Sequence, residues 1–126
     1  MEVICLDTGL LIEFYRSKNK KNTFLFKISQ KYKFAIPTIV KYEVLRGDKI
    51  RDKFWIEFFK GTQILPFDDE CSQIASEIYK NLKKNRNLIG TDDILIASIA
   101  IKNNYKLATL NKKDFIRING IKLITK

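Results

Sequence analysis

The sequence contains no histidine, and this absence limits the kinds of enzyme that the chain can be. Without an imidazole there is no serine or cysteine nucleophile activated by histidine, no acid–base mechanism built on paired histidines and no histidine-ligated zinc. If the chain is an enzyme, carboxylates or lysine and tyrosine side chains must carry its chemistry.

Cysteine, proline and glycine are scarce, with 2, 2 and 5 residues respectively. Cys5 and Cys71 each lie inside an apolar pattern without the spacing of a metal site, so we expect two free, buried thiols. No apolar run approaches the roughly 20 residues of a membrane-spanning helix, and the apolar start at 3–6 is too short for a signal peptide. We therefore expect a cytoplasmic protein that does not enter the membrane.

The composition is that of a globular protein, with 45% hydrophobic and 30% charged residues among 126. A chain of this length can bury a core without disulfides or metals, so we expect one domain spanning 1–126. The net charge of +10 favours a polyanionic partner such as nucleic acid or an anionic membrane. A bias in genome composition is the alternative, because the sequence is rich in isoleucine, lysine and asparagine, and lysine outnumbers arginine.

Predicted strands and helices alternate along the chain. Short apolar runs indicate strands at 3–6, 34–36, 63–67, 106–110 and 121–125. Helical spacing indicates helices at 8–17, 22–32, 38–47, 51–60, 68–82 and 94–101, the third of them capped by Thr38. This alternation predicts an α/β fold, a three-layer sandwich around a mostly parallel sheet of about five strands.

Two acidic residues occupy positions that need an explanation. Asp7 ends the first predicted strand, where open α/β sheets form their binding crevice, although an aspartate there can also cap the next helix. Glu43 shares the apolar side of its helix with Val40, whereas Tyr42 and Arg46 point elsewhere on the helical wheel. A carboxylate at the margin of that apolar side, reaching water, is the alternative for Glu43.

Two further acids follow later in the chain. Asp93 opens the apolar helix directly after Asp92, and one acid is enough to cap a helix, so we expect Thr91 or Asp92 to cap and Asp93 to point into the crevice. Asp114 follows the strand at 106–110, where an ordinary surface turn is the alternative. Clustered carboxylates repel one another and favour a hard cation such as Mg²⁺ or Mn²⁺. Such an ion could activate water against a phosphodiester, which would allow a chain without histidine to hydrolyse RNA.

Four segments resemble, in order, the motifs of VapC-type PIN domains. The first is Leu-Asp-Thr at 6–8 with Leu-Ile at 11–12, and the second is Pro-Thr-Ile-Val-Lys-Tyr-Glu-Val-Leu-Arg-Gly at 37–47. The third is Asp-Ile-Leu-Ile-Ala at 93–97, and the closing segment covers 107–115 and 118–121. The resemblance extends over essentially the whole chain.

The resemblance implies the PIN fold, metal-dependent endoribonuclease activity, homodimerisation and inhibition by a small antitoxin protein whose tail enters the active site. By residue, it implies that the catalytic acids and metal ligands are Asp7, Glu43, Asp93 and Asp114, with Thr8, Thr109 and Asn111 as the polar residues around them. Asp92, next to Asp93, is a further candidate supporting residue. Other PIN domains carry an acid where Asn111 stands, so whether Asp114 binds a second metal or only contacts the metal ligands stays open.

Two alternatives remain. A catalytically silent PIN-like module would bind RNA or protein, although the presence of all four acids argues against it. A metal-free ribonuclease using lysine, arginine and tyrosine would leave the acids unexplained and would keep its activity in EDTA. The aromatic-rich segment at 54–59 has more apolar bulk than one short helix usually buries, so we expect most of its rings in the core and part of them at a two-fold interface.

Overall fold

The structure, a computed structural model, describes residues 1–126 of the chain. Five parallel strands form one sheet in the order β3-β2-β1-β4-β5. The residues at the end of β1 are buried, as expected of a central strand with helices on both faces. The strands are β1 (Glu2–Leu6), β2 (Tyr32–Pro37), β3 (Gln63–Leu65), β4 (Leu107–Thr109) and β5 (Leu123–Thr125).

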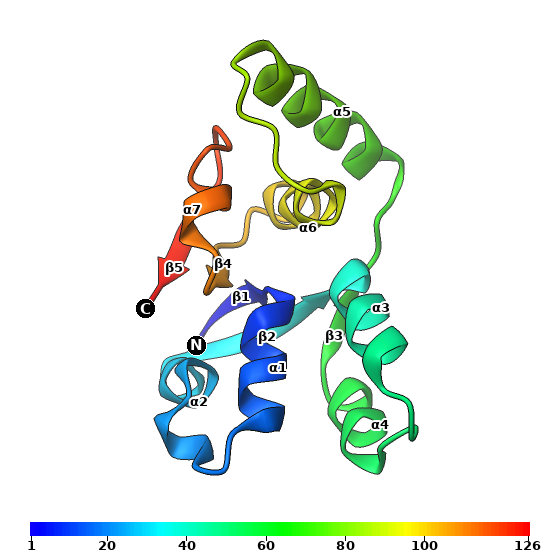
Figure 1. Ribbon diagram of the computed structural model, residues 1–126, viewed down its shortest axis with the longest axis vertical. Helices are drawn as coiled ribbons and strands as arrows, with labels where there is room; N and C mark the ends of the chain where they lie inside the picture. Colours follow the sequence, from blue (N-terminus) through cyan, green and yellow to red (C-terminus); the bar gives the residue numbers. More distant parts are fainter.

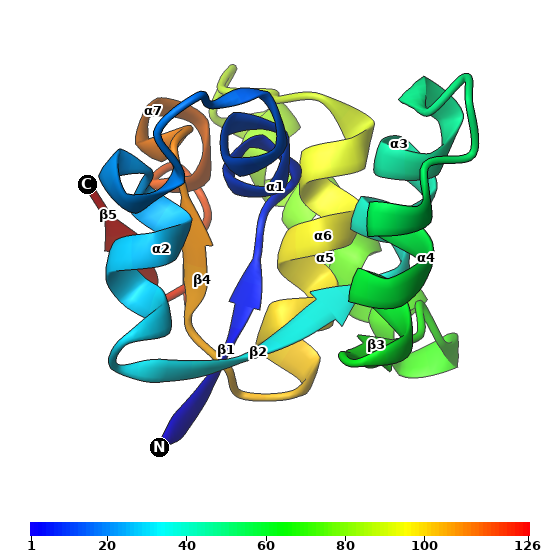
Figure 2. The ribbon, with the colours of Figure 1, turned by 90° about the horizontal axis from the view of Figure 1, so that it is seen from below.

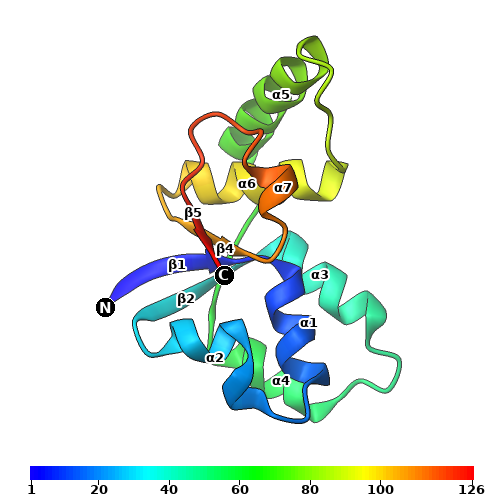
Figure 3. The ribbon, with the colours of Figure 1, turned by 60° about the vertical axis from the view of Figure 1, so that its left-hand side comes forward.

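Helices cover both faces of the sheet, which gives the molecule three layers (Figure 1). One face carries α5 (Asp69–Lys84) and α6 (Thr91–Lys102). The opposite face, also seen in Figure 3, carries α1 (Thr8–Arg16), the 3-10 helix η1 (Lys20–Asn22), α2 (Phe24–Ser29), α3 (Thr38–Gly47) and α4 (Lys53–Lys60). A short helix, α7 (Lys112–Phe115), connects the last two strands. The predicted sandwich around a parallel sheet of about five strands is confirmed.

The strand order creates a crevice at the edge where the strands end. From β1 the chain winds outwards through β2 and β3, and it then crosses to β4 and β5 on the other side of β1. The winding direction therefore changes between β1 and β4, and ligands of open α/β sheets bind at such switch points. Figure 2 shows β1 and β4 ending on the same edge, with α1 and α7 following them.

One cluster of buried apolar side chains fills the space between the layers. Both cysteines are free and buried in this cluster, as predicted. Burial raises the pKa of the Cys5 thiol to about 12, so this thiol stays neutral and inert at neutral pH. None of the helices combines the length and apolar character that crossing a membrane requires.

The aromatic residues of α4 pack within the chain. Trp55 and Phe59 are buried, and the Trp55 ring centroid lies 5.0 Å from that of Tyr15 in α1. The half-buried rings of Phe54 and Phe58 stack on each other with centroids 6.1 Å apart. Two of the four rings therefore enter the core, and the other two pack against it.

Several elements are shorter than predicted because strand pairing limits them. The helix expected at 22–32 is confined to α2, since Tyr32 instead pairs with Glu2 at the start of the sheet. Strands β3, β4 and β5 each have three residues, because β3 pairs with β2, and β4 with β5, only over that length. Those strands were expected at 63–67, 106–110 and 121–125.

Two predicted helix caps are wrong. Thr38 is the first residue of α3, and Pro37 holds the N-cap position without a side-chain hydrogen bond. Helix α6 likewise begins at Thr91 behind Gly90, so neither Thr91 nor Asp92 caps it. Pro37 and Gly90 have extended backbones, with ψ angles of 137° and 147°, that lead directly into the helix. The residues expected to cap these helices therefore lie inside them, because each N-cap falls at least one residue earlier.

Candidate active site

Asp7 lies at the carboxyl end of β1, where the neighbouring strand β4 orients it. Its backbone N–H donates to the Ala108 carbonyl at 3.0 Å. The carboxylate accepts hydrogen bonds from the Thr8 N–H at 2.8 Å and from the Thr109 hydroxyl at 2.7 Å. Asp7 is thus the N-cap of α1 and also a member of the acidic group at the switch point. Burial raises the pKa of Asp7, although the bonds from Thr109 and Thr8 oppose that rise.

Glu43 reaches the same region from α3. Its Oε1 accepts a hydrogen bond of 2.6 Å from the Thr8 hydroxyl, and its side chain is only 15% exposed. Burial raises the pKa of Glu43; the Thr8 bond opposes this rise and the neighbouring Asp92 adds to it. Thr8 therefore connects two acids, since its backbone N–H bonds Asp7 and its hydroxyl bonds Glu43.

Asp93 and Asp114 share one asparagine side chain. The Nδ2 atom of Asn111 donates to Asp93 Oδ2 at 3.3 Å and to Asp114 Oδ2 at 3.1 Å. The backbone N–H of Asn111 donates to the Thr109 hydroxyl at 2.9 Å. Because that hydroxyl also bonds Asp7, the end of β4 connects the acids of β1, α6 and α7. Asp114 lies in α7 rather than in the surface turn that was its alternative.

The charge on Asp93 is disfavoured by its surroundings. Burial, followed by repulsion from Asp7, Asp114 and Asp92, raises the pKa of Asp93 to about 6. Asp93 therefore lies near these other carboxylates, and it shares Asn111 with Asp114. A side chain with such a strongly shifted pKa beside like charges is typical of a functional site.

Two arginines border the acids, and neither was predicted as part of the site. Arg46 was expected to point away from Glu43, but its guanidinium reaches back to within 3.5 Å of Glu43 and 3.8 Å of Asp92. Arg117 approaches Asp114 at 3.9 Å. Each arginine follows its acid by three residues in the sequence, Arg46 within α3 and Arg117 just after α7, and this spacing could have identified both.

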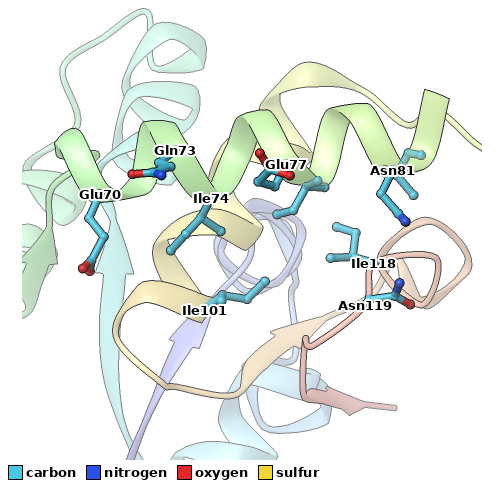
Figure 4. A pocket seen from close by; sticks show the side chains of 10 residues that line it. Glu70, Gln73, Ile74, Glu77, Asn81, Ile101, Ile118 and Asn119 are labelled. Carbon is cyan, nitrogen blue, oxygen red and sulfur yellow. The ribbon is translucent and has the colours of Figure 1, made fainter. Parts of the chain in front are cut away.

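Two cavities of the structure lie away from these acids. The larger, of about 560 Å³, lies between α5, α6 and the segment after α7, and its lining includes Ile74, Ile101 and Ile118 (Figure 4). None of the acids at the switch point lines it. The second cavity lies between α3 and α4, and none of these acids lines it either.

Comparison with known proteins identifies the family. Residues 4–121 match the family described as PIN domain. The chain belongs to the PIN domain family. This PIN domain is 35% identical to Ribonuclease VapC of Rickettsia bellii over 131 residues, which covers 97% of this chain and 95% of that protein. It is 32% identical to Ribonuclease VapC1 of Methanocaldococcus jannaschii over 127 residues, which covers 98% of this chain and 88% of that protein.

Solved structures match the fold of this PIN domain. VapBC2 from Rickettsia felis, bound to a DNA fragment from its promoter, contains a chain with a TM-score of 0.79 and 26% identity over 98% of both chains. VapBC-1 from nontypeable Haemophilus influenzae gives a TM-score of 0.83 at 21% identity, over 98% of this chain and 97% of that chain. The predicted resemblance to VapC-type PIN domains is confirmed.

Proposed function

We propose that this PIN domain is a metal-dependent endoribonuclease and the toxin of a VapBC-type toxin–antitoxin pair. The observation that carries the proposal is the convergence of four acids, Asp7, Glu43, Asp93 and Asp114, at the switch point of the sheet. The relatives that share about a third of its residues over nearly the whole chain are named Ribonuclease VapC. A ribonuclease without histidine needs another source of acid–base chemistry, and these carboxylates offer one.

The donor set fits Mg²⁺ or Mn²⁺. Every ligand offered is a carboxylate oxygen, and hard divalent ions prefer such ligands. The repulsion that raises the pKa of Asp93 to about 6 would be relieved by a bound cation. As the side chains stand, no three of the acids are arranged to hold an ion, and they accept hydrogen bonds from Thr8, Thr109 and Asn111 instead. Metal binding would therefore exchange some of these bonds.

The residues of the site have separable tasks. When bound, the metal supplies an activated water and stabilises the negative charge that develops on the phosphodiester. Asp7, Glu43 and Asp93 would hold it, with Asp114 as a further acid. Thr8 orients the partly buried carboxylate of Glu43, and Thr109 orients the buried carboxylate of Asp7. Fixing ligand orientation in this way limits the reorganisation needed when substrate arrives.

The partners that we propose are an RNA substrate, an antitoxin and a second copy of the chain. The matched structures from Rickettsia felis and Haemophilus influenzae are VapBC assemblies, which supports a protein partner of the antitoxin kind. The net charge of +10 suits RNA, because phosphates release counterions when basic side chains bind them. Homodimerisation is checked by light scattering at about tens of micromolar protein, where interfaces of ordinary size are formed; a monomer there would contradict it.

Cleavage of a structured RNA tests the proposal. The purified chain should cut it in Mg²⁺ or Mn²⁺, lose activity in EDTA and regain activity when metal is restored. Asp93→Asn keeps the size of the side chain but removes its charge, so activity should fall by about two orders of magnitude or more. Full activity in EDTA would favour a metal-free mechanism, and RNA binding without any cleavage would favour a silent module.

Asp92→Asn is the matched control. Asp92 neighbours Asp93, but its side chain is 45% exposed and contacts Arg46 rather than Asn111. Its replacement should change activity by no more than a few fold, and circular dichroism should show that both variants are folded. An inactive Asp92→Asn together with an active Asp93→Asn would mean that the third motif is assigned one residue too late.

A further inference from the structure

The two arginines beside the acids are held in different ways. Arg117 donates to the backbone carbonyls of Asn87 at 3.4 Å and Leu88 at 3.2 Å, and its side chain is 27% exposed. These bonds tie the segment after α7 to the loop that precedes α6. Arg117 is therefore anchored to the framework, and its guanidinium is already committed to protein partners.

Arg46 is not anchored to any backbone group. Its side chain is 54% exposed, and its ion contacts with Glu43 and Asp92, at 3.5 and 3.8 Å, are longer than charge-assisted hydrogen bonds. Its guanidinium also lies 5.2 Å from the centre of the exposed Tyr42 ring. Exposed contacts of this kind are weak, so the guanidinium can exchange them at little cost.

Arg46 lies where a positive charge could bind the negatively charged substrate. The crevice gathers five carboxylates, those of Asp7, Glu43, Asp92, Asp93 and Asp114, which repel an approaching phosphodiester. Arg46 is the exposed cation in contact with this group, and it bridges α3 and α6 across the side opposite α7. A guanidinium presents paired N–H donors that match two oxygens of one phosphate.

We propose that Arg46 is a substrate-binding residue that leaves Glu43 and Asp92 to hold a phosphate of the RNA next to the bond that is cut. This inference rests on the proposed ribonuclease function and adds a contact to it. Arg46 thereby sets the affinity for RNA, whereas Arg117 holds the site in shape.

Binding of a short fluorescein-labelled single-stranded RNA, followed by anisotropy in EDTA at several NaCl concentrations, tests the role of Arg46 without cleavage. Arg46→Gln should weaken binding roughly tenfold at low salt, as expected for one lost charge-assisted contact. The plot of the logarithm of the binding constant against the logarithm of the salt concentration should also become less steep. Its slope should change by about 0.7, the value for one phosphate contact on a single strand. In cleavage assays with Mn²⁺, KM should rise while kcat stays within about a few fold.

Arg16→Gln is the matched control, because it removes the same charge from an exposed arginine at the far end of α1, about 13 Å along that helix from Asp7. Arg16→Gln should change the salt dependence of RNA binding by much less than Arg46→Gln does.

Three outcomes would contradict the inference. If the two variants bind RNA alike while Arg46→Gln changes the affinity for Mn²⁺, Arg46 only positions Glu43 and the inference is wrong. If the wild type cleaves RNA but both variants match it, the inference fails and the proposed function stands. Absence of both RNA binding and cleavage in the wild type would overturn both.

Discussion

The raised pKa of Asp93 makes the stability of the fold depend on pH. Its pKa of about 6 lies well above the ordinary value for aspartate, so the folded chain holds its proton more tightly than the unfolded chain does. The stability that this provides is present at low pH and is lost as pH rises through about 6. At neutral pH the ionised carboxylate therefore destabilises the metal-free fold, as functional residues commonly do.

Replacing Asp93 by asparagine should consequently stabilise the metal-free protein above pH 6. The shift of the Asp93 pKa by about two units corresponds to about 3 kcal/mol in the free energy of unfolding. Solvent screening at this partly exposed side chain reduces the expected gain to about 1 kcal/mol. Thermal unfolding in EDTA should show a higher Tm for Asp93→Asn at about pH 7.5 and little difference near pH 4. Asp92→Asn, with its exposed side chain, should not gain stability. A lower Tm for Asp93→Asn at neutral pH would mean that neither burial nor repulsion disfavours the charge on Asp93.

Thr109 supports Asp7 from the adjacent strand. The threonine is fully buried, and its hydroxyl is one of two donors to the Asp7 carboxylate. Thr109→Val keeps the shape but removes this donor, so a buried carboxylate loses a partner at a cost of about 1–3 kcal/mol. Urea unfolding at neutral pH measures the loss. Thr125→Val is the control, because Thr125 pairs with Thr109 in the sheet register but lies on the edge strand; an equal effect of both substitutions would rule out a special role for Thr109.

The acids of the candidate site could be named from the sequence because each has a recognisable place in a motif, and their role as metal ligands stays a prediction. The hydrogen-bond partners followed from the same motifs only as a set of residues, without their pairing. That Thr109 bonds Asp7, and that Asn111 bonds both Asp93 and Asp114, depends on β4 lying next to β1. The spacing of three residues could have indicated that Arg46 reaches Glu43 and that Arg117 reaches Asp114. The contact between Arg46 and Asp92, by contrast, depends on α3 packing beside α6.

At the scale of elements, helix α5 shows where sequence patterns are strong. Its apolar positions and acidic start predicted the helix correctly, and Asp68 caps it by accepting a hydrogen bond from the Cys71 N–H at 2.9 Å. Shorter elements were predicted less well. Three-residue strands and the helix α7 are defined by their neighbours in space, so their limits could not be read from local sequence.

Asp68 also ties α5 to α6. The Cys71 N–H and the Lys102 ammonium, 3.0 Å away, lower the pKa of Asp68 to about 2. A lowered pKa means stability that is present above the ordinary aspartate pKa and is lost as pH falls toward 2. Asp68→Ala should therefore lower the urea midpoint at pH 7, and the difference from wild type should shrink as pH falls below about 4. Asp69→Ala, one residue further on and exposed, should have a smaller effect that changes little over this range.

At the scale of the whole molecule, the strand order explains why residues from distant parts of the chain meet. The change of winding direction between β1 and β4 leaves their ends side by side, and α3 and α6 contribute acids from the two opposite layers (Figures 1 and 2). The sequence predicted the layers and the parallel sheet from the alternation of elements. It did not predict the strand order, because pairing among β1, β2 and β4 depends on packing across the whole sheet.

Calorimetric titration of the purified chain with Mn²⁺ at about pH 7.5, above the pKa of Asp93, tests directly whether the four acids form a metal site. The wild type should bind Mn²⁺ saturably, because the ion relieves the repulsion among the carboxylates. Asp93→Asn should weaken binding by about tenfold or more, whereas Asp92→Asn should retain it within about a few fold. No saturable binding to the folded wild type, or equal binding by Asp93→Asn, would contradict the existence of this site.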